Sequence, residues 1–434
     1  MLEVSLLSVR TLAPVYTVAG IGLIAVTVLA RRRLWWLLGG AVLGAAVGAL
    51  LSWWVGDVLN LVDVSPSWVD RFWVSAVLAG FGVAIAAAIR GRWLVRLVAG
   101  ISVIVFALAG GLAINRDAGF YPTVADAIGL SHVKPIALPA VTSGSTAFRP
   151  DLASSWQAPS DLPEKGRYGS IKIPGLVSKF AARRAIVYLP PAALIKNPPK
   201  LPVLIALSGQ GPGAAPANVI EAGRLVSRLN TIAKANRGLT PIVVIPDQLS
   251  RPTNNPMCVN GRLGNSSTYL SVDVVNWIHK KLNAQTGRQA LAISGFSQGG
   301  TCAIQLGAEF PQKFGSLIDV SGQLGPVLDS GQDTVKLGFA GDKAAYERAQ
   351  PLNILDRNRP YKHSNAFFAV GQDDSRYGPD MPVVSQAARE AGMDVTTLIV
   401  PDSGHDWATA GIGLQAGITW IMPRVGLANP TPEA

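Results

Sequence analysis

One pentapeptide of this sequence, Gly295–Gly299, combines a nucleophilic hydroxyl with the glycines that a sharp turn requires. Its pattern is Gly-x-Ser-x-Gly, and Ser297 is the central residue. An apolar run, Leu291–Ser294, precedes it, and a segment of helical character, Gly299–Phe310, follows it. In a strand–turn–helix context, such a turn exposes the serine hydroxyl at the positive end of the following helix. The pattern predicts that Ser297 is a nucleophile for attack on a carbonyl carbon.

A serine nucleophile needs a base, and the chain offers four histidines. His405 lies within Ser403–Trp407, soon after the apolar run Thr396–Val400. The loop after the last strand of an α/β sheet is a suitable place for the base, so we predict that His405 is the base. The other three histidines lie in a linker, on a helix and in a polar stretch before a strand: His132, His279 and His363.

The third group of such a site is a carboxylate that orients the imidazole. We expect it between the serine and the histidine in chain order. Asp373 and Asp374 follow the apolar run Phe367–Val370, and either could fill this role. We favour Asp374, which lies three residues after Gly371, and keep Asp373 as the alternative.

An oxyanion intermediate must be held by two backbone N–H groups. The amide of Gln298, directly after the nucleophile, is the first expected donor. The second should come from the loop after an earlier strand, and Leu207–Gly211 has this place. We predict Gln210 as that donor; the alternative is an ordinary glycine-rich turn.

From Tyr168 onwards, short apolar runs alternate with helical segments. The runs are expected strands: Arg184–Leu189, Val203–Ser208, Ile242–Pro246, Ala290–Ser294, Ser316–Val320, Ala366–Val370 and Thr396–Val400. The expected helices are Ala217–Ala235, Thr268–Asn283, Gly299–Phe310, Val383–Ala391 and Asp406–Ile421. Nearly continuous apolar strands that alternate with helices predict a mostly parallel sheet with helices on both faces.

The N-terminal part of the chain has a different composition. Four stretches without a charged residue are each long enough to cross a hydrocarbon layer of about 30 Å. They are residues 11–30, 34–56, 72–89 and 97–115. The predicted organisation is a transmembrane domain of four helices over 1–116, a linker over 117–166, an α/β domain over 167–424 and a tail over 425–434.

Basic residues predict how these spans are oriented. Arg31–Arg33 lie between the first two spans, and Arg90, Arg92 and Arg96 lie between the last two. The connection between the second and third spans is acidic and holds only one arginine, Arg71. The positive-inside rule therefore places the arginine-rich turns in the cytoplasm. The N-terminus and everything after Asn115 are expected outside, so the protein is predicted to be a multi-pass cell-membrane protein with an extracytoplasmic α/β domain.

Composition also limits the partners. Gly40, Gly44 and Gly48 recur at four-residue spacing, which suits close packing within the bundle or with another membrane protein. The net charge is +11, which either attracts anionic headgroups and envelope polymers or serves solubility alone. The chain has no basic run with interleaved aromatic residues, so a nucleic acid partner is not expected.

The chain has two cysteines, Cys258 and Cys302. In a domain outside the cell they are expected to pair, which would tie a long loop to the helix behind the nucleophile. The alternative is two buried, unrelated thiols. Their spacing does not suit a metal site, and the sequence predicts no metal and no cofactor.

Three motifs resemble one branch of the α/β-hydrolases, which includes esterase D, feruloyl esterases and mycolyltransferases of the antigen 85 type. They are Leu207–Gly209, Gly295–Gly300 and Gly404–Trp407. The segments around Cys258, Thr268–Ile278 and Thr301–Ala303 are similar to membrane-linked esterases of actinobacteria. The resemblance covers Tyr168–Ile421.

The resemblance implies ester hydrolysis or acyl transfer through an acyl-serine, with Ser297, Asp374 and His405 as the triad. The residues after the serine, Gln298–Gly300, and an aspartate in the acid position argue against trehalose mycolyl transfer. Four spans before an esterase resemble actinobacterial hydrolases of aminoacyl-phosphatidylglycerol metabolism. We therefore expect a lipid or envelope esterase; the alternatives are an envelope acyltransferase and a non-catalytic binding or scaffold module on a hydrolase fold.

Overall fold

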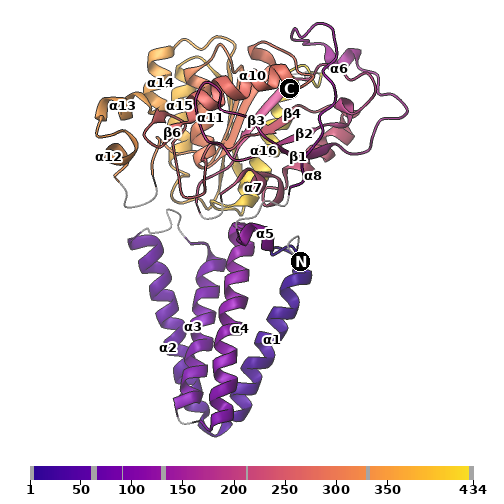
Figure 1. The fold of residues 1–434 in the computed structure, drawn as a ribbon. Helices are drawn as coiled ribbons and strands as arrows, with labels where there is room; N and C mark the ends of the chain where they lie inside the picture. The colour runs from indigo at the N-terminus through magenta and orange to yellow at the C-terminus, as the bar shows by residue number, and fades with distance from the viewer. Residues whose placement is uncertain are drawn as a thin grey trace. The chain divides into compact units, whose positions relative to one another are not determined.

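The computed structural model describes residues 4–59, 66–89, 91–128, 133–211, 214–328 and 333–429, so His132 lies outside the described residues. The chain forms two compact units, both drawn in Figure 1. The first comprises Met1–His132 with Asp329–Gly331, and the second comprises Val133–Leu328 with Gln332–Ala434.

Four helices of the first unit are long and apolar enough to cross a membrane, as predicted. They are α1 (Val9–Leu29), α2 (Leu34–Trp53), α3 (Trp68–Ile89) and α4 (Trp93–Ala118). Two shorter segments flank α2, namely η1 (Arg31–Arg33) and η2 (Trp54–Val58). The long helix α4 ends at Ala118 and is followed by Gly119, whose φ of 68° favours a residue without a side chain.

The glycine repeat of α2 lies against α3. A Cβ atom added to Gly40 would be 2.4 Å from the carbonyl oxygen of Gly82, and one added to Gly44 would be 2.0 Å from that of Leu78. A Cβ atom on Gly48 would lie 2.6 Å from the Cα atom of Ser75. Only hydrogen fits at these three positions, so the repeat serves the contact between two helices of the bundle.

The second unit is built on an eight-stranded sheet of order β1-β2-β4-β3-β7-β8-β9-β10. Its strands are β1 (Arg167–Ile171), β2 (Ala185–Leu189), β3 (Val203–Leu207), β4 (Ile242–Ile245), β7 (Leu291–Phe296), β8 (Ser316–Val320), β9 (Asn365–Gly371) and β10 (Asp394–Val400). Strand β2 runs antiparallel to both β1 and β4. Every pairing from β4 to β10 is parallel. A separate hairpin joins β5 (Asn260–Gly261) to β6 (Gly264–Asn265).

Helices cover both faces of this sheet (Figure 1). One face packs against η4 (Tyr269–Asp273), α10 (Val274–Lys281), α11 (Gln298–Glu309), α14 (Pro351–Asn358) and α15 (Asp380–Glu390). The other packs against α7 (Pro216–Glu221), α8 (Leu225–Ala235) and α16 (Trp407–Ile421). Shorter helical elements are α5 (Val124–Ala127), α6 (Leu152–Ser155), η3 (Pro191–Ala193), α9 (Ser266–Thr268), η5 (Arg288–Ala290), α12 (Thr334–Gly338) and α13 (Lys343–Arg348). This is the predicted α/β-hydrolase architecture.

Residues of the predicted linker that follow Val133 have fixed partners on the α/β unit. The N–H of Thr142 donates to Oδ1 of Asn283 at 2.7 Å. The indole of Trp156 donates to the carbonyl of Arg237 at 2.9 Å. In the predicted tail, Val425 and Leu427 are buried in the main core. Described segments before the first strand and after the last helix of the α/β unit therefore have fixed contacts with the rest of that unit.

Candidate active site

Ser297 occupies the sharp turn between β7 and α11. Its φ of 58° and ψ of −122° lie in a region that residues with a side chain rarely adopt. The turn is too tight for side chains at its flanks, since a Cβ atom on Gly295 would be 2.1 Å from the carbonyl oxygen of Gly299. A Cβ atom on Gly299 would be 2.4 Å from the carbonyl oxygen of Ser208. The two glycines of the pentapeptide are thus required by close backbone approach.

Three side chains predicted from the sequence meet beside this turn. Nε2 of His405 lies 2.8 Å from Oγ of Ser297, and Nδ1 of His405 lies 2.8 Å from Oδ2 of Asp374. The loops after β10 and β9 supply the histidine and the aspartate. Asp373, the alternative acid, is exposed instead. A carboxylate at Nδ1 accepts a hydrogen bond from the N–H there, which leaves Nε2 unprotonated and able to accept the serine proton.

Aromatic rings hold the imidazole of His405 in place. The rings of Phe296 and Tyr377 have centroids 5.0 Å and 4.7 Å from that of His405. The neighbouring carboxylate of Asp406 accepts the N–H of Thr409 at 2.8 Å and so caps α16. Asp406 therefore has a structural role, and the imidazole packs against two aromatic rings.

Asp374 is suited to stay ionised. Burial raises the pKa of its carboxyl, but the hydrogen bond and charge of His405 and the N–H of Tyr377 outweigh burial. The Tyr377 N–H donates to Oδ1 at 3.0 Å, while the other oxygen faces the imidazole. The net effect holds the pKa of Asp374 below its usual range, so the carboxylate stabilises a protonated imidazole at neutral pH.

The loop after β3 also reaches the nucleophile. A Cβ atom on Gly209 would lie 3.4 Å from Cβ of Ser297, so the adjacent Gln210 belongs to the same site. Gln298 is the first residue of α11, and the first N–H groups of a helix have no acceptor within it. The two residues predicted as oxyanion donors therefore both lie next to the serine, one in the chain and the other through the loop after β3.

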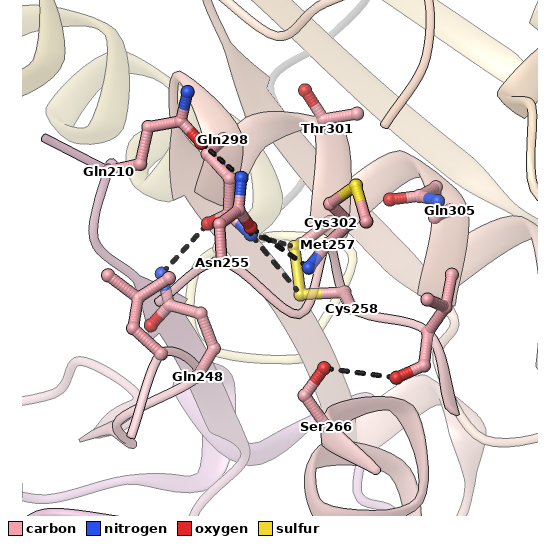
Figure 2. Close-up of a disulfide and its surroundings, with 12 residues drawn as sticks. Gln210, Gln248, Asn255, Met257, Cys258, Ser266, Gln298, Thr301, Cys302 and Gln305 are labelled. Carbon is pink, nitrogen blue, oxygen red and sulfur yellow. Dashed lines mark hydrogen bonds between the residues drawn. A yellow bond between two sulfur atoms is a disulfide. The ribbon is translucent and has the colours of Figure 1, made fainter. Parts of the chain in front are cut away.

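Four side-chain amides are joined by hydrogen bonds into what we call the amide cluster: Gln210, Gln248, Asn255 and Gln298 (Figure 2). The predicted disulfide between Cys258 and Cys302 lies against it. Nε2 of Gln298 donates to Sγ of Cys302 at 3.2 Å. Gln248 and Asn255 were not foreseen from the sequence. The only signal for them is position, since one follows β4 and the other precedes the paired cysteine of the same loop.

A buried carboxylic acid, Asp319, lies next to the first turn of α11. Asp319 in β8 accepts the N–H of Gly322 at 2.9 Å, and a Cβ atom on Gly300 would lie 2.4 Å from its Oδ1. Burial and the charge of Asp380 raise its pKa to about 7, against the opposing effect of the Gly322 N–H. The folded state therefore binds a proton that the unfolded state has lost above pH 4 or so.

This raised pKa predicts a pH effect on stability. Below the pKa of Asp319 in the unfolded chain, the proton is bound in both states. As pH rises through the pKa of Asp319 in the folded protein, near 7, the wild type loses free energy of unfolding relative to Asp319→Asn. Between pH 5 and pH 8, the melting temperature of the variant should rise relative to that of the wild type by at least about 2 °C. Asp161 is exposed, so the melting temperature of Asp161→Asn should change with pH as that of the wild type does. If the difference in melting temperature between Asp319→Asn and the wild type is the same at both pH values, the raised pKa of Asp319 is wrong.

This fold, with a serine at a strand–helix turn hydrogen-bonded to a histidine–aspartate pair, defines the class of α/β-hydrolases. Two solved structures share the fold. A ferulic acid esterase has a TM-score of 0.52 at 18% identity, covering 60% of this chain and 99% of its own. An S-formylglutathione hydrolase from Agrobacterium tumefaciens has a TM-score of 0.50 at 20% identity, covering 61% and 97%.

The family model named "Putative esterase" matches residues 181–408, which is just over half of the chain. The chain belongs to this esterase family, as its motifs indicated. An uncharacterized protein of Corynebacterium glutamicum is 29% identical over 409 residues, which cover 92% of each chain. That relative matches along nearly the whole length, so the similarity includes the apolar helices as well as the α/β unit.

Proposed function

We propose that the protein is a membrane-anchored serine esterase whose α/β unit lies outside the cytoplasm and cleaves an ester of a lipid or envelope component. The observation that carries the proposal is the hydrogen-bonded chain from Ser297 through His405 to Asp374. Membership of the esterase family supports the same reaction type.

The chemistry follows from this chain of groups. Oγ of Ser297 attacks the ester carbonyl while Nε2 of His405 takes its proton. The N–H groups of Gln210 and Gln298 hold the resulting oxyanion. When the intermediate collapses, His405 protonates the departing alkoxide and the acyl group stays on the serine. Water then attacks the acyl-serine, gives its proton to His405, and releases the carboxylic acid and the free serine.

Features outside the triad support a lipid or envelope substrate. Four helices suited to crossing a bilayer share the chain with the α/β unit. Residues 131–434 carry 29 basic and 21 acidic residues, and such a charge excess attracts anionic headgroups. The Cys258–Cys302 disulfide fits an oxidising compartment, in agreement with the arginine-rich turns lying in the cytoplasm. Aminoacyl-phosphatidylglycerol, an ester with an anionic lipid, is our specific candidate.

A reconstitution experiment tests the substrate. Purified full-length protein and its Ser297→Ala variant are placed in vesicles that contain aminoacyl-phosphatidylglycerol, phosphatidylglycerol or a neutral diacylglycerol ester. We expect the wild type alone to release the free amino acid, at least about tenfold faster than it releases fatty acid. If the protein releases amino acid and fatty acid at similar rates, aminoacyl-phosphatidylglycerol is not its specific substrate. Transfer of the acyl group to an added alcohol in preference to water would favour the acyltransferase.

A further inference from the structure

Asn255 joins the two predicted oxyanion donors. Its Nδ2 donates to the side-chain oxygen of Gln210, and its Oδ1 accepts from Nε2 of Gln298 at 3.1 Å (Figure 2). Gln210 lies on the loop after β3, whereas Gln298 begins α11. One buried amide therefore connects the two segments of backbone whose N–H groups must converge on a single oxygen atom.

The orientation of this amide is fixed by two backbone groups. The N–H of Met257 donates to Oδ1 of Asn255 at 2.9 Å, and the carbonyl of Val327 accepts from Nδ2 at 2.9 Å. A flipped amide would oppose both groups, so the nitrogen faces Gln210 and the oxygen faces Gln298. All the polar atoms of the Asn255 side chain are thus used.

The rest of the amide cluster locks Gln298 itself. Nε2 of Gln248 donates to Oε1 of Gln298 at 3.1 Å and to the carbonyl of Ser208 at 2.6 Å. The disulfide ties Cys258, three residues after Asn255, to Cys302 on the catalytic helix. Hydrogen bonds buried in this way are costly to break, because a polar group left without a partner cannot turn to water.

We propose that Asn255 is a positioning residue that sets the separation of the Gln210 and Gln298 N–H groups; this rests on the proposed esterase function. The Asn255 side chain is buried, and its polar atoms are all bonded within the protein. Its substitution should weaken the hydrogen bonds to the oxyanion, because a donor displaced by about 1 Å stabilises the transition state much less. The effect should therefore appear in kcat and leave KM nearly unchanged.

Asn255→Asp is the sharpest test because it keeps the shape and both acceptor contacts but removes the donors to Gln210 and Val327. We expect kcat for a p-nitrophenyl ester to fall about 10- to 100-fold, with KM within about threefold. The affinity of phenylboronic acid, which forms a tetrahedral adduct with the serine, should fall by the same factor as kcat/KM.

The matched control lies one residue away. Nδ2 of Asn254 donates to the carbonyls of Leu249 and Leu263 at 2.9 and 3.0 Å, within the same loop but away from the donors. Asn254→Asp removes two similar bonds and should keep kcat within about threefold. If it lowers kcat as much as Asn255→Asp does, the loop matters only for folding and the inference is wrong.

Gln210→Leu gives a second route that keeps the buried asparagine. The substitution removes the half-buried side-chain oxygen that accepts the hydrogen bond from Asn255. We expect kcat to fall about tenfold, and the double variant with Asn255→Asp to lose no more activity than Asn255→Asp alone. Full activity in this variant, or effects that simply multiply, would overturn the inference. A wild-type protein without esterase turnover or fluorophosphonate labelling would instead refute the proposed function.

Discussion

Replacing Ser297 with alanine should lower ester turnover by about 10⁴- to 10⁶-fold. The variant loses the oxygen that lies 2.8 Å from Nε2 of His405, so no acyl-enzyme can form. Folding should be unaffected, because alanine keeps the Cβ atom of serine and meets the same backbone restriction at a φ of 58°. Hydrolysis of a p-nitrophenyl ester and labelling by a fluorophosphonate probe measure the effect.

Ser294→Ala is the matched control for this prediction. Its hydroxyl is buried in β7, the strand that leads to Ser297, and donates to the carbonyl of Ile205 at 3.1 Å. The control should label at nearly the wild-type rate. Persistent labelling of Ser297→Ala would place the nucleophile elsewhere, and absence of labelling in the wild type would favour a non-catalytic binding module.

Asp374→Asn should lower kcat by about 10³- to 10⁴-fold with little change in KM. An asparagine of the same size cannot stabilise the protonated imidazole, and its amide can hold His405 in the tautomer that presents a proton to the serine. The low pKa of the native carboxyl means that it is ionised throughout the neutral range. Kinetics at pH 7 to 8 therefore compare a charged with a neutral partner.

Asp373→Asn provides the comparison within the same dipeptide. The side chain of Asp373 is exposed, and its backbone N–H, which the substitution keeps, donates to the carbonyl of Ser403 at 2.9 Å. We expect activity within about threefold of the wild type. Equal losses in the two variants would mean that the loop, rather than one carboxylate, supports the histidine.

Much of the architecture was predictable because its signals are local. Each parallel strand from β3 to β10 is a short apolar run, and the turn at Ser297 is marked by its two glycines. The sequence favoured Asp374 over Asp373 only through its distance from Gly371, because the directions of adjacent loop side chains are not encoded in a local pattern. In the structure, the hydrogen bond from the Tyr377 N–H to Asp374 fixes which carboxylate faces the histidine.

Other features have no periodic signal. Strand β1 is an edge strand that contains a glycine and was not foreseen, and the short helices α12 to α14 were missed for want of length. The expected helix over Ala217–Ala235 is divided into α7 and α8, because Arg224 adopts a φ of 54° between them. Asn255 could be recognised only in three dimensions, since its partners are brought together by the sheet.

The bond between Cys258 and Cys302 has a consequence for biogenesis. A newly made chain in a reducing cytoplasm holds two free thiols, so the loop that carries Asn255 is not yet fastened to the helix behind the nucleophile. On the proposed topology, the disulfide between Cys258 and Cys302 forms only after translocation. Full hydrolytic competence would then be delayed until export, and under the proposed lipid substrate the inner leaflet would not be hydrolysed during synthesis.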